Sequence, residues 1–392
     1  MKKGFLSFFT NNIIFYIIFS VIFLNFCYID SLPYVKMLVR IFTIAFLPFV
    51  TLINFVYNKK SKYMHIFMAF LLLLLLATIV NIDANITRFF SIYVPIFELI
   101  IYADIVLNLD AKKGIKRLSN IFFLFVVANI ISIIVFPNGL FKSALYSNNW
   151  ILGYDNMHIM YYIPAIVLEK INCILSGKKH SFRYLFLITM ITYAVIFCFS
   201  ANSLVAYCLF MFLLVFSNID RKAIFNAYTV TIIFSVLSLL IVVFSANFEV
   251  VNLFITNILH KSLTFSGRTG IWALALAYIA KKPFLGYGLE PVEMVTSKFG
   301  SIHATHAHNT ILDVMYKGGT ISFFAFAYMF YLSAKNLYHN RTDILAKVIT
   351  YGLFAIYIMS IFEAREDKFG LYIILLLGFK IGEIIKEREV NE

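Results

Sequence analysis

Residues 64–82 have the sequence M-H-I-F-M-A-F-L-L-L-L-L-L-A-T-I-V-N-I, which is apolar almost throughout. An α-helix of roughly 20 such residues is long enough to cross the hydrocarbon core of a bilayer. Similar runs recur along the whole chain. Short segments of alternating apolar and polar residues, which a membrane β-barrel requires, are not seen. The sequence therefore predicts an all-α polytopic membrane protein.

The composition supports the same class. Hydrophobic residues make up 61% of the 392 residues, and charged residues only 14%. About a quarter of the residues in a soluble protein are charged. The length therefore measures membrane spans and not soluble domains, so we expect one membrane domain over residues 1–392.

About twelve runs have the length of a membrane span. They are 12–28, 38–57, 64–82, 89–107, 118–136, 157–175, 184–200, 204–216, 224–246, 310–333, 344–362 and 369–385.

The formal net charge of +13 raises the possibility of a nucleic-acid partner. The lysines and arginines instead cluster in short loops after the even-numbered spans and near both ends of the chain. This is the positive-inside pattern, and it predicts a multi-pass protein with both termini cytoplasmic. Topology and contact with anionic lipid headgroups account for most of the charge, so no nucleic-acid partner is expected.

With this orientation, one outer segment is large: residues 247–309. It contains S-G-R-T-G-I-W (266–272), K-K-P-F-L-G-Y-G (281–288) and H-A-T-H-A-H-N (303–309), and K-G-G (317–319) follows. Residues 271–280 are apolar nearly all round, which indicates a helix lying against the membrane that ends at the following Lys-Lys-Pro. We expect this extracytoplasmic loop to carry the chemistry, because titratable groups gather there.

Three histidines lie within six positions: His303, His306 and His308. An unperturbed imidazole pKa near 6.5 suits a general base at neutral pH. A zinc site is the alternative, but no cysteine or carboxylate lies at ligand spacing in the sequence. We therefore predict a base among these histidines, with no metal and no cofactor.

Arg268 opens the apolar helix of the outer segment. Its planar guanidinium, beside the free N–H groups of a helix start, suits a phosphate. An interfacial arginine that only reaches for headgroups is the alternative. Lys281 and Lys282 in the same segment favour phosphate binding, because positive charge on the outer side opposes the topological bias.

Three acidic residues fall within apolar runs, where such groups are costly and commonly functional: Glu98, Asp104 and Asp313. Asp313 lies shortly after His308, and it either orients a histidine or pairs with Lys317 four residues later. A second outer charged cluster lies between the last two spans, and a solvated turn is an equally simple interpretation of it. Its members are Glu363, Arg365, Glu366 and Asp367.

The three quoted segments, together with Gly318 and Gly319, resemble the signature of the O-antigen ligase and polymerase superfamily. The resemblance implies a GT-C-like glycosyltransferase that uses an undecaprenyl-diphosphate-linked donor without a metal, in the inner membrane of a bacterium. It implies that His308, followed by Asn309, is the catalytic histidine and that Arg268 is the loop arginine. Ligases often carry a G-S-R element where this chain has F-S-A-N-S (199–203), so the arginine of a second phosphate clamp is absent there, and Arg40, Arg88 and Arg365 are candidates to replace it.

Within this superfamily the chain is most similar to the polymerases of O-antigen or capsule repeat units (Wzy-type). A ligase that transfers polysaccharide to lipid A core, a step of lipopolysaccharide assembly, is the first alternative. A polysaccharide or lipid-linked sugar flippase is the second, although transporters usually show paired repeats with broken spans. The implied partners are undecaprenyl-diphosphate-linked glycans, membrane lipids and a chain-length regulator protein.

The expected reaction is a direct displacement in which His308 deprotonates an acceptor hydroxyl and Arg268 stabilises the leaving diphosphate. The residues expected to bind substrate beside them are Lys281, Lys282, His306, Asn309, Arg88 and Arg365.

Overall fold

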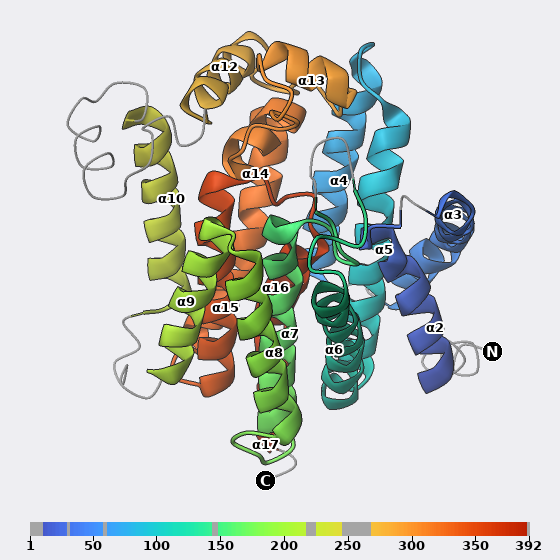
Figure 1. Cartoon of the computed structure of the whole chain (residues 1–392), viewed down its shortest axis with the longest axis vertical. Helices are drawn as coiled ribbons and strands as arrows, with labels where there is room; N and C mark the ends of the chain where they lie inside the picture. Colours follow the sequence, from blue (N-terminus) through green and yellow to red (C-terminus); the bar gives the residue numbers. More distant parts are fainter. Residues whose placement is uncertain are drawn as a thin grey trace.

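The structure is a computed structural model, and it describes residues 11–29, 32–57, 61–142, 148–216, 225–244 and 268–389. Most helices stand side by side as a bundle, while α12 (Arg268–Lys281) and α13 (Val292–Lys298) lie across one end of it (Figure 1). We call this the α12 end. The short C-terminal helix α17 (Ile381–Glu389) lies at the other end.

The remaining helices follow the chain in order. They are α2 (Asn12–Phe23), η1 (Leu24–Phe26), α3 (Pro33–Tyr57), α4 (Lys62–Val80), α5 (Ile86–Leu109), α6 (Ala111–Val135), α7 (Asp155–Leu175), α8 (Phe182–Cys198), α9 (Ala201–Val215), α10 (Ala227–Phe244), α14 (Thr310–His339), α15 (Ile344–Phe362) and α16 (Phe369–Phe379).

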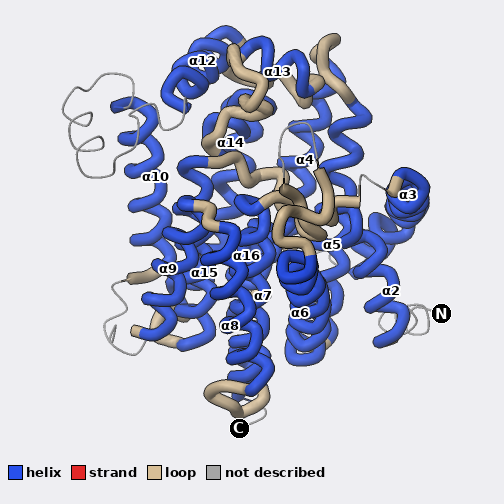
Figure 2. Tube along the Cα trace, viewed as in Figure 1, coloured by secondary structure: helices blue, strands red, loops and turns tan. Residues whose placement is uncertain are grey.

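Each of the twelve predicted spans coincides with one of these helices over the residues that the structure describes. Six helices are long and apolar enough to cross a bilayer: α3, α4, α5, α6, α7 and α15. Shorter apolar helices account for five more spans, and α14 for the remaining one. Figure 2 shows helices joined by loops, and no strand in the described ranges. The predicted all-α polytopic membrane class is thus confirmed.

The predicted outer helix of residues 271–280 is also found, as α12. Its buried face carries Ile271, Trp272 and Ala275, which pack with Tyr316 of α14 into a small core of their own. The outer segment is therefore not a separate folded domain, because its core includes α14. Residues 247–267, which complete the predicted outer loop, lie outside the described residues, as do the ends of the predicted span 224–246.

Helix α14 is broken at Gly319, which has a φ of 65° and a ψ of −173°. The segment 283–288 fills the break. The N–H groups of Tyr287 and Gly288 donate to the carbonyls of Tyr316 and Lys317, both at 2.8 Å. On the other side of the break, the N–H of Thr320 donates to the carbonyl of Pro283 at 2.8 Å. The loop thus supplies the hydrogen bonds that the helix lacks.

Glycine is required on both sides of this contact. Gly286 has a φ of 65°, and a Cβ there would overlap the Tyr316 carbonyl. A Cβ on Gly319 would overlap the carbonyl of Phe284. The positive φ values add strain for any L side chain. The sequences K-P-F-L-G-Y-G and K-G-G are therefore two halves of one structural joint, which fixes the break in α14.

Candidate functional site

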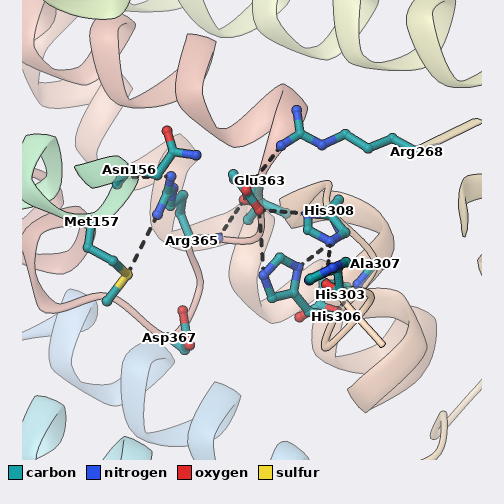
Figure 3. Close-up of polar contacts among 12 residues, drawn as sticks. Asn156, Met157, Arg268, His303, His306, Ala307, His308, Glu363, Arg365 and Asp367 are labelled. Carbon is teal, nitrogen blue, oxygen red and sulfur yellow. Dashed lines mark hydrogen bonds and ion pairs between the residues drawn. The ribbon is translucent and has the colours of Figure 1, made fainter. Parts of the chain in front are cut away.

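The candidate site lies at the α12 end, where the loop after α15 meets the start of α14. Its centre is the carboxylate of Glu363. One oxygen, Oε1, accepts from Nη2 of Arg268 at 3.1 Å. The other, Oε2, lies 2.8 Å from Nδ1 of His308 and 3.5 Å from Nε2 of His306. Figure 3 shows the three side chains converging on Glu363.

His308 is held in a constrained geometry. Its φ of 48° is in the left-handed region, which non-glycine residues seldom adopt outside functional sites. Because a carboxylate only accepts, Nδ1 of His308 carries the proton toward Glu363. Nε2 lies 3.3 Å from the carbonyl of His303, which also only accepts, so both ring nitrogens face acceptors. The imidazolium formed by proton uptake at Nε2 would donate to that carbonyl and, through Nδ1, to the Glu363 carboxylate.

His306 is arranged differently. Its Nδ1 accepts from the backbone N–H of His308 at 3.1 Å, so the lone pair of Nδ1 is already used. The proton is on Nε2, which points toward Glu363. Burial lowers the pKa of His306 to about 4, against the opposing charge of Glu363. His306 is therefore neutral at physiological pH and is a poor base, whereas Nε2 of His308 contacts a backbone carbonyl that a substrate hydroxyl can replace.

Contacts from four helices, α10, α12, α14 and α15, hold the histidine loop. Trp272 of α12 donates its indole N–H to the carbonyl of His308 at 3.3 Å. The backbone N–H of Ala307 donates to Oδ1 of Asp313 at 2.8 Å. Asn309 caps α14 by accepting from two backbone N–H groups of its first turn, and its amide donates to Ser238 and to the carbonyl of Ile361. The motif residues around His308 thus position the imidazole.

Asp313 was expected either to orient a histidine or to pair with Lys317. The structure shows the ion pair, with 2.5 Å between Lys317 Nζ and Asp313 Oδ2. Lys317 also contacts Glu366 at 2.5 Å. The residue that contacts the imidazole of His308 is Glu363, which the sequence analysis did not select. Its only signal in the sequence was its place in the charged cluster after span 344–362.

That cluster is not a solvated turn. Glu363, Arg365 and Glu366 are 4%, 1% and 0% exposed, so the solvated interpretation is wrong. Burial opposes ionisation of Glu363, but the hydrogen bond from His308 and the surrounding cationic groups lower its pKa below the usual range. Burial and the nearby Asp313 carboxylate instead raise the pKa of Glu366. The carboxylate facing His308 is thus the charged one.

Arg365 is a buried cation without a carboxylate in ion-pair contact among the described residues. Its Nη2 donates to the carbonyl of Asn156 at 3.1 Å, its Nη1 lies 4.0 Å from Met157 Sδ, and its Nε has no partner. The side chain of Asn156 accepts from Ser200 and, at 3.4 Å, from Ser203. These serines belong to F-S-A-N-S, the stretch that lacks the arginine of the ligase pattern. Asn156 thus contacts both Arg365 and these two serines.

The other predicted substrate-binding cations do not reach Glu363. Lys282 contacts Asn81 at 2.5 Å, and Lys281 lies over the Tyr278 ring at 5.1 Å. Arg88 donates to the backbone carbonyl of Glu290. Of the residues predicted from the sequence, the structure therefore brings together His308, His306 and Arg268, with Arg365 nearby.

A metal ion is a chemical alternative at this place. His306, His308 and Glu363 each offer one ligand atom, and these atoms lie within 4.8 Å of one another. Three such ligands with an open position are typical of zinc. The guanidinium of Arg268 on the same carboxylate opposes a second cation there. No carboxylate lies at ligand spacing in the sequence, and the one that reaches these histidines, Glu363, comes from a distant segment.

Comparison with known families agrees with the resemblance. Residues 185–327 match the family model described as O-antigen ligase. The match runs from α8 into α14, so it includes Arg268, His306 and His308 and stops before Glu363. No curated protein sequence matches the chain. The suspected resemblance to the O-antigen ligase and polymerase superfamily is thus confirmed over residues 185–327, and the long apolar helices indicate an integral membrane protein.

Proposed function

Starting from a membrane enzyme of the O-antigen ligase and polymerase type, we propose that this chain polymerises oligosaccharide repeat units carried on undecaprenyl diphosphate. The product is an O-antigen or capsular polysaccharide, made on the outer side of the bacterial inner membrane. In this proposal the chain is one membrane domain of the GT-C type, and the outer segment 247–309 carries the site together with the loop after α15.

The observation that supports this proposal most is the His308–Glu363 pair. A buried, ionised carboxylate on Nδ1 fixes the imidazole tautomer and stabilises the imidazolium that forms on proton uptake. A direct displacement on a sugar needs one such base for the acceptor hydroxyl. The chain needs no covalent intermediate for this chemistry.

In the proposed step, Nε2 of His308 takes the proton of an acceptor hydroxyl on one lipid-linked repeat unit. The oxygen forms a bond to the anomeric carbon of the growing chain, and the bond from that carbon to the diphosphate oxygen breaks. The diphosphate leaves with the electron pair, and the anomeric centre inverts. The acceptor hydroxyl takes the position beside Nε2 that the His303 carbonyl now holds.

Two arginines are suited to the leaving diphosphate. Arg268 is 20% exposed and shares Glu363 with the histidine, so it can turn toward a ligand without leaving the site. Arg365 has buried donors without an anionic partner in the described structure, which is a costly arrangement that an anion would relieve. In this proposal Arg365 replaces the arginine missing from F-S-A-N-S, and Lys281, Lys282 and Arg88 guide substrate farther out.

Product analysis tests the function directly. Purified protein is given a lipid-linked repeat unit, and the products are examined by mass spectrometry. A ladder of chain lengths is the expected result. A single transfer to added lipid A core would replace polymerase by ligase. Movement of the lipid-linked glycan across vesicles without any new glycosidic bond would replace both by a flippase.

Orientation and metal independence are tested separately. A reporter fused at Ser297 is expected to be extracytoplasmic and one at Lys113 cytoplasmic, in accord with the basic loops. A cytoplasmic signal at Ser297 would contradict the proposed reaction. A chelator is expected to leave transfer unchanged, and a loss restored by zinc would turn His306, His308 and Glu363 into metal ligands.

A further inference from the structure

Lys317 of α14 is a buried lysine with two buried acidic partners, and it is 9% exposed. Its Nζ lies 2.5 Å from Oδ2 of Asp313 and 2.5 Å from Oε1 of Glu366. Its backbone is held by the joint at the break in α14, where its carbonyl accepts from the N–H of Gly288 at 2.8 Å. Both carboxyl groups are 0% exposed. One buried cation thus joins two acidic side chains from different elements, α14 and the loop after α15.

The contact with Asp313 leads to His308. The other oxygen of Asp313, Oδ1, accepts from the backbone N–H of Ala307 at 2.8 Å. Ala307 directly precedes His308, whose φ of 48° is unfavourable for a residue with a side chain. Such a conformation persists only where the surrounding contacts hold it. Asp313 supplies one of these contacts, and Lys317 supplies the cation without which a buried carboxylate is costly.

The contact with Glu366 leads to Glu363. Glu366 lies three residues after Glu363 in the loop between α15 and α16. The carboxylate of Glu363 is 2.8 Å from Nδ1 of His308. Through Asp313 and Glu366, Lys317 therefore joins the two segments whose side chains meet in the His308–Glu363 pair.

Thr310 makes a second tie between the same segments. Its hydroxyl donates to the carbonyl of Glu363 at 3.0 Å and accepts from the backbone N–H of Arg365 at 2.9 Å. These bonds hold the loop after α15 against the first turn of α14, and neither involves the backbone that precedes His308. Loss of the Lys317 side chain should therefore displace the imidazole without separating the two segments.

We infer that Lys317 is a positioning residue, which aligns the imidazole of His308 with the Glu363 carboxylate through Asp313 and Glu366. The kinetic consequence rests on the proposed function, because His308 is the base only in that proposal. The alignment itself is a property of the fold. A lysine that only stabilised α14 would change the folded fraction and leave the imidazole of the folded molecules as it is.

The alignment is tested by NMR of the full-length protein in nanodiscs, labelled with ¹⁵N at histidine. The Nδ1–H signal of His308 is identified by its absence from His308→Gln, and a hydrogen bond to a carboxylate moves such a proton signal downfield. Lys317→Met is compared with Lys380→Met. Lys380 is the matched control, because it is also buried and pairs with Asp104 and Glu383, but lies between α16 and α17 at the other end of the bundle (Figure 1).

Lys317→Met is expected to move the His308 signal upfield or to broaden it, and Lys380→Met to leave it unchanged. An unchanged signal in Lys317→Met, or the same change in both variants, would overturn the inference. If Lys317→Met does not fold, Lys317→Met combined with Glu366→Gln takes its place under the same criterion. This double variant leaves one buried carboxylate without the lysine, and not two.

Transfer kinetics separate this inference from the proposed function. In Lys317→Met, kcat should fall about tenfold with KM for the lipid-linked repeat unit nearly unchanged, because the base is misplaced while the substrate contacts remain. In a Glu363→Gln background the same change should add little, since the aligned pair is already lost. A further loss of about tenfold there would overturn the inference. A moved His308 signal with an unchanged transfer rate would instead reject His308 as the base and keep the alignment.

Discussion

Two buried glutamates, Glu363 and Glu169, each pair with an arginine, and their other partners differ. Glu363 joins Arg268 to His308 at the α12 end. Glu169 of α7 pairs with Arg183 at 3.3 Å and accepts from Ser119 at 2.5 Å. Asn156, which contacts Arg365 beside the first site, is also on α7. The two clusters are thus about 20 Å apart along one helix.

The comparison shows which features separate the carboxylate of the proposed site from a structural one. Burial and an arginine partner are common to both, so neither is diagnostic. Glu169 is surrounded by hydroxyl and amide groups that do not titrate near neutral pH. Glu363 contacts two imidazoles, and one of them, His308, has a left-handed backbone and turns its other nitrogen to a backbone carbonyl. The two clusters therefore differ in the kind of side chain that contacts the carboxylate and in the backbone strain of that contacting residue.

The largest effect is expected for His308→Ala. Loss of a positioned base should lower the transfer rate about 10²–10⁴-fold, while the protein still inserts and binds donor. Initial rates with a lipid-linked repeat unit measure this. His303→Ala is the matched control, because only the backbone carbonyl of His303 contacts the imidazole. Near-normal polymer from His308→Ala would remove His308 from the mechanism.

The next prediction tests whether the two glutamates differ in role, by comparing Glu363→Gln with Glu169→Gln. Glutamine at 363 can no longer stabilise an imidazolium, so the transfer rate should fall on the order of 10- to 100-fold. Glutamine at 169 should cost stability on the order of 1–3 kcal/mol and leave the rate per folded molecule unchanged. Rates are normalised to the folded fraction from size-exclusion chromatography. Equal loss of rate in both variants would mean that the two clusters do not differ in role.

Arg268→Lys should have a smaller effect, on the order of tenfold in transfer rate. Lysine keeps the charge but loses the planar fork that fits a phosphate and a carboxylate together. Arg183→Lys, the equivalent change beside Glu169, should leave transfer unchanged. An Arg268→Lys enzyme as fast as the parent would indicate that the arginine only anchors the segment at the interface.

The smallest effect concerns acid stability. Burial lowers the folded-state pKa of His306 to about 4, below the ordinary 6.5 of the unfolded chain. Between these values the unfolded state binds more protons, so stability should fall as the pH drops from 6.5 toward 4. His306→Asn should remove this part of the acid sensitivity, as measured by melting temperature across that range. A parallel pH dependence in both proteins would show that His306 does not titrate in this way.

The fold was largely predictable, because apolar runs of membrane length are a local signal. His308, His306 and Arg268 were also found from the sequence, since they belong to short motifs. Glu363 was missed because it is 55 positions from His308, and no local pattern relates the two. Arg365 was only one of several candidate arginines. Its proximity to Ser200 depends on Asn156, in a third segment.

The break in α14 has a consequence for how this protein can be divided. Four hydrogen bonds join the backbone around Gly319 to segment 283–288, and those of Tyr287 and Gly288 lie between buried residues, where water does not replace them. Deleting or grafting the outer segment would leave a membrane helix with unsatisfied peptide groups at its middle. The outer segment and α14 therefore form one structural unit. An exchange of this segment between related proteins has to include both residues 283–288 and the residues around Gly319.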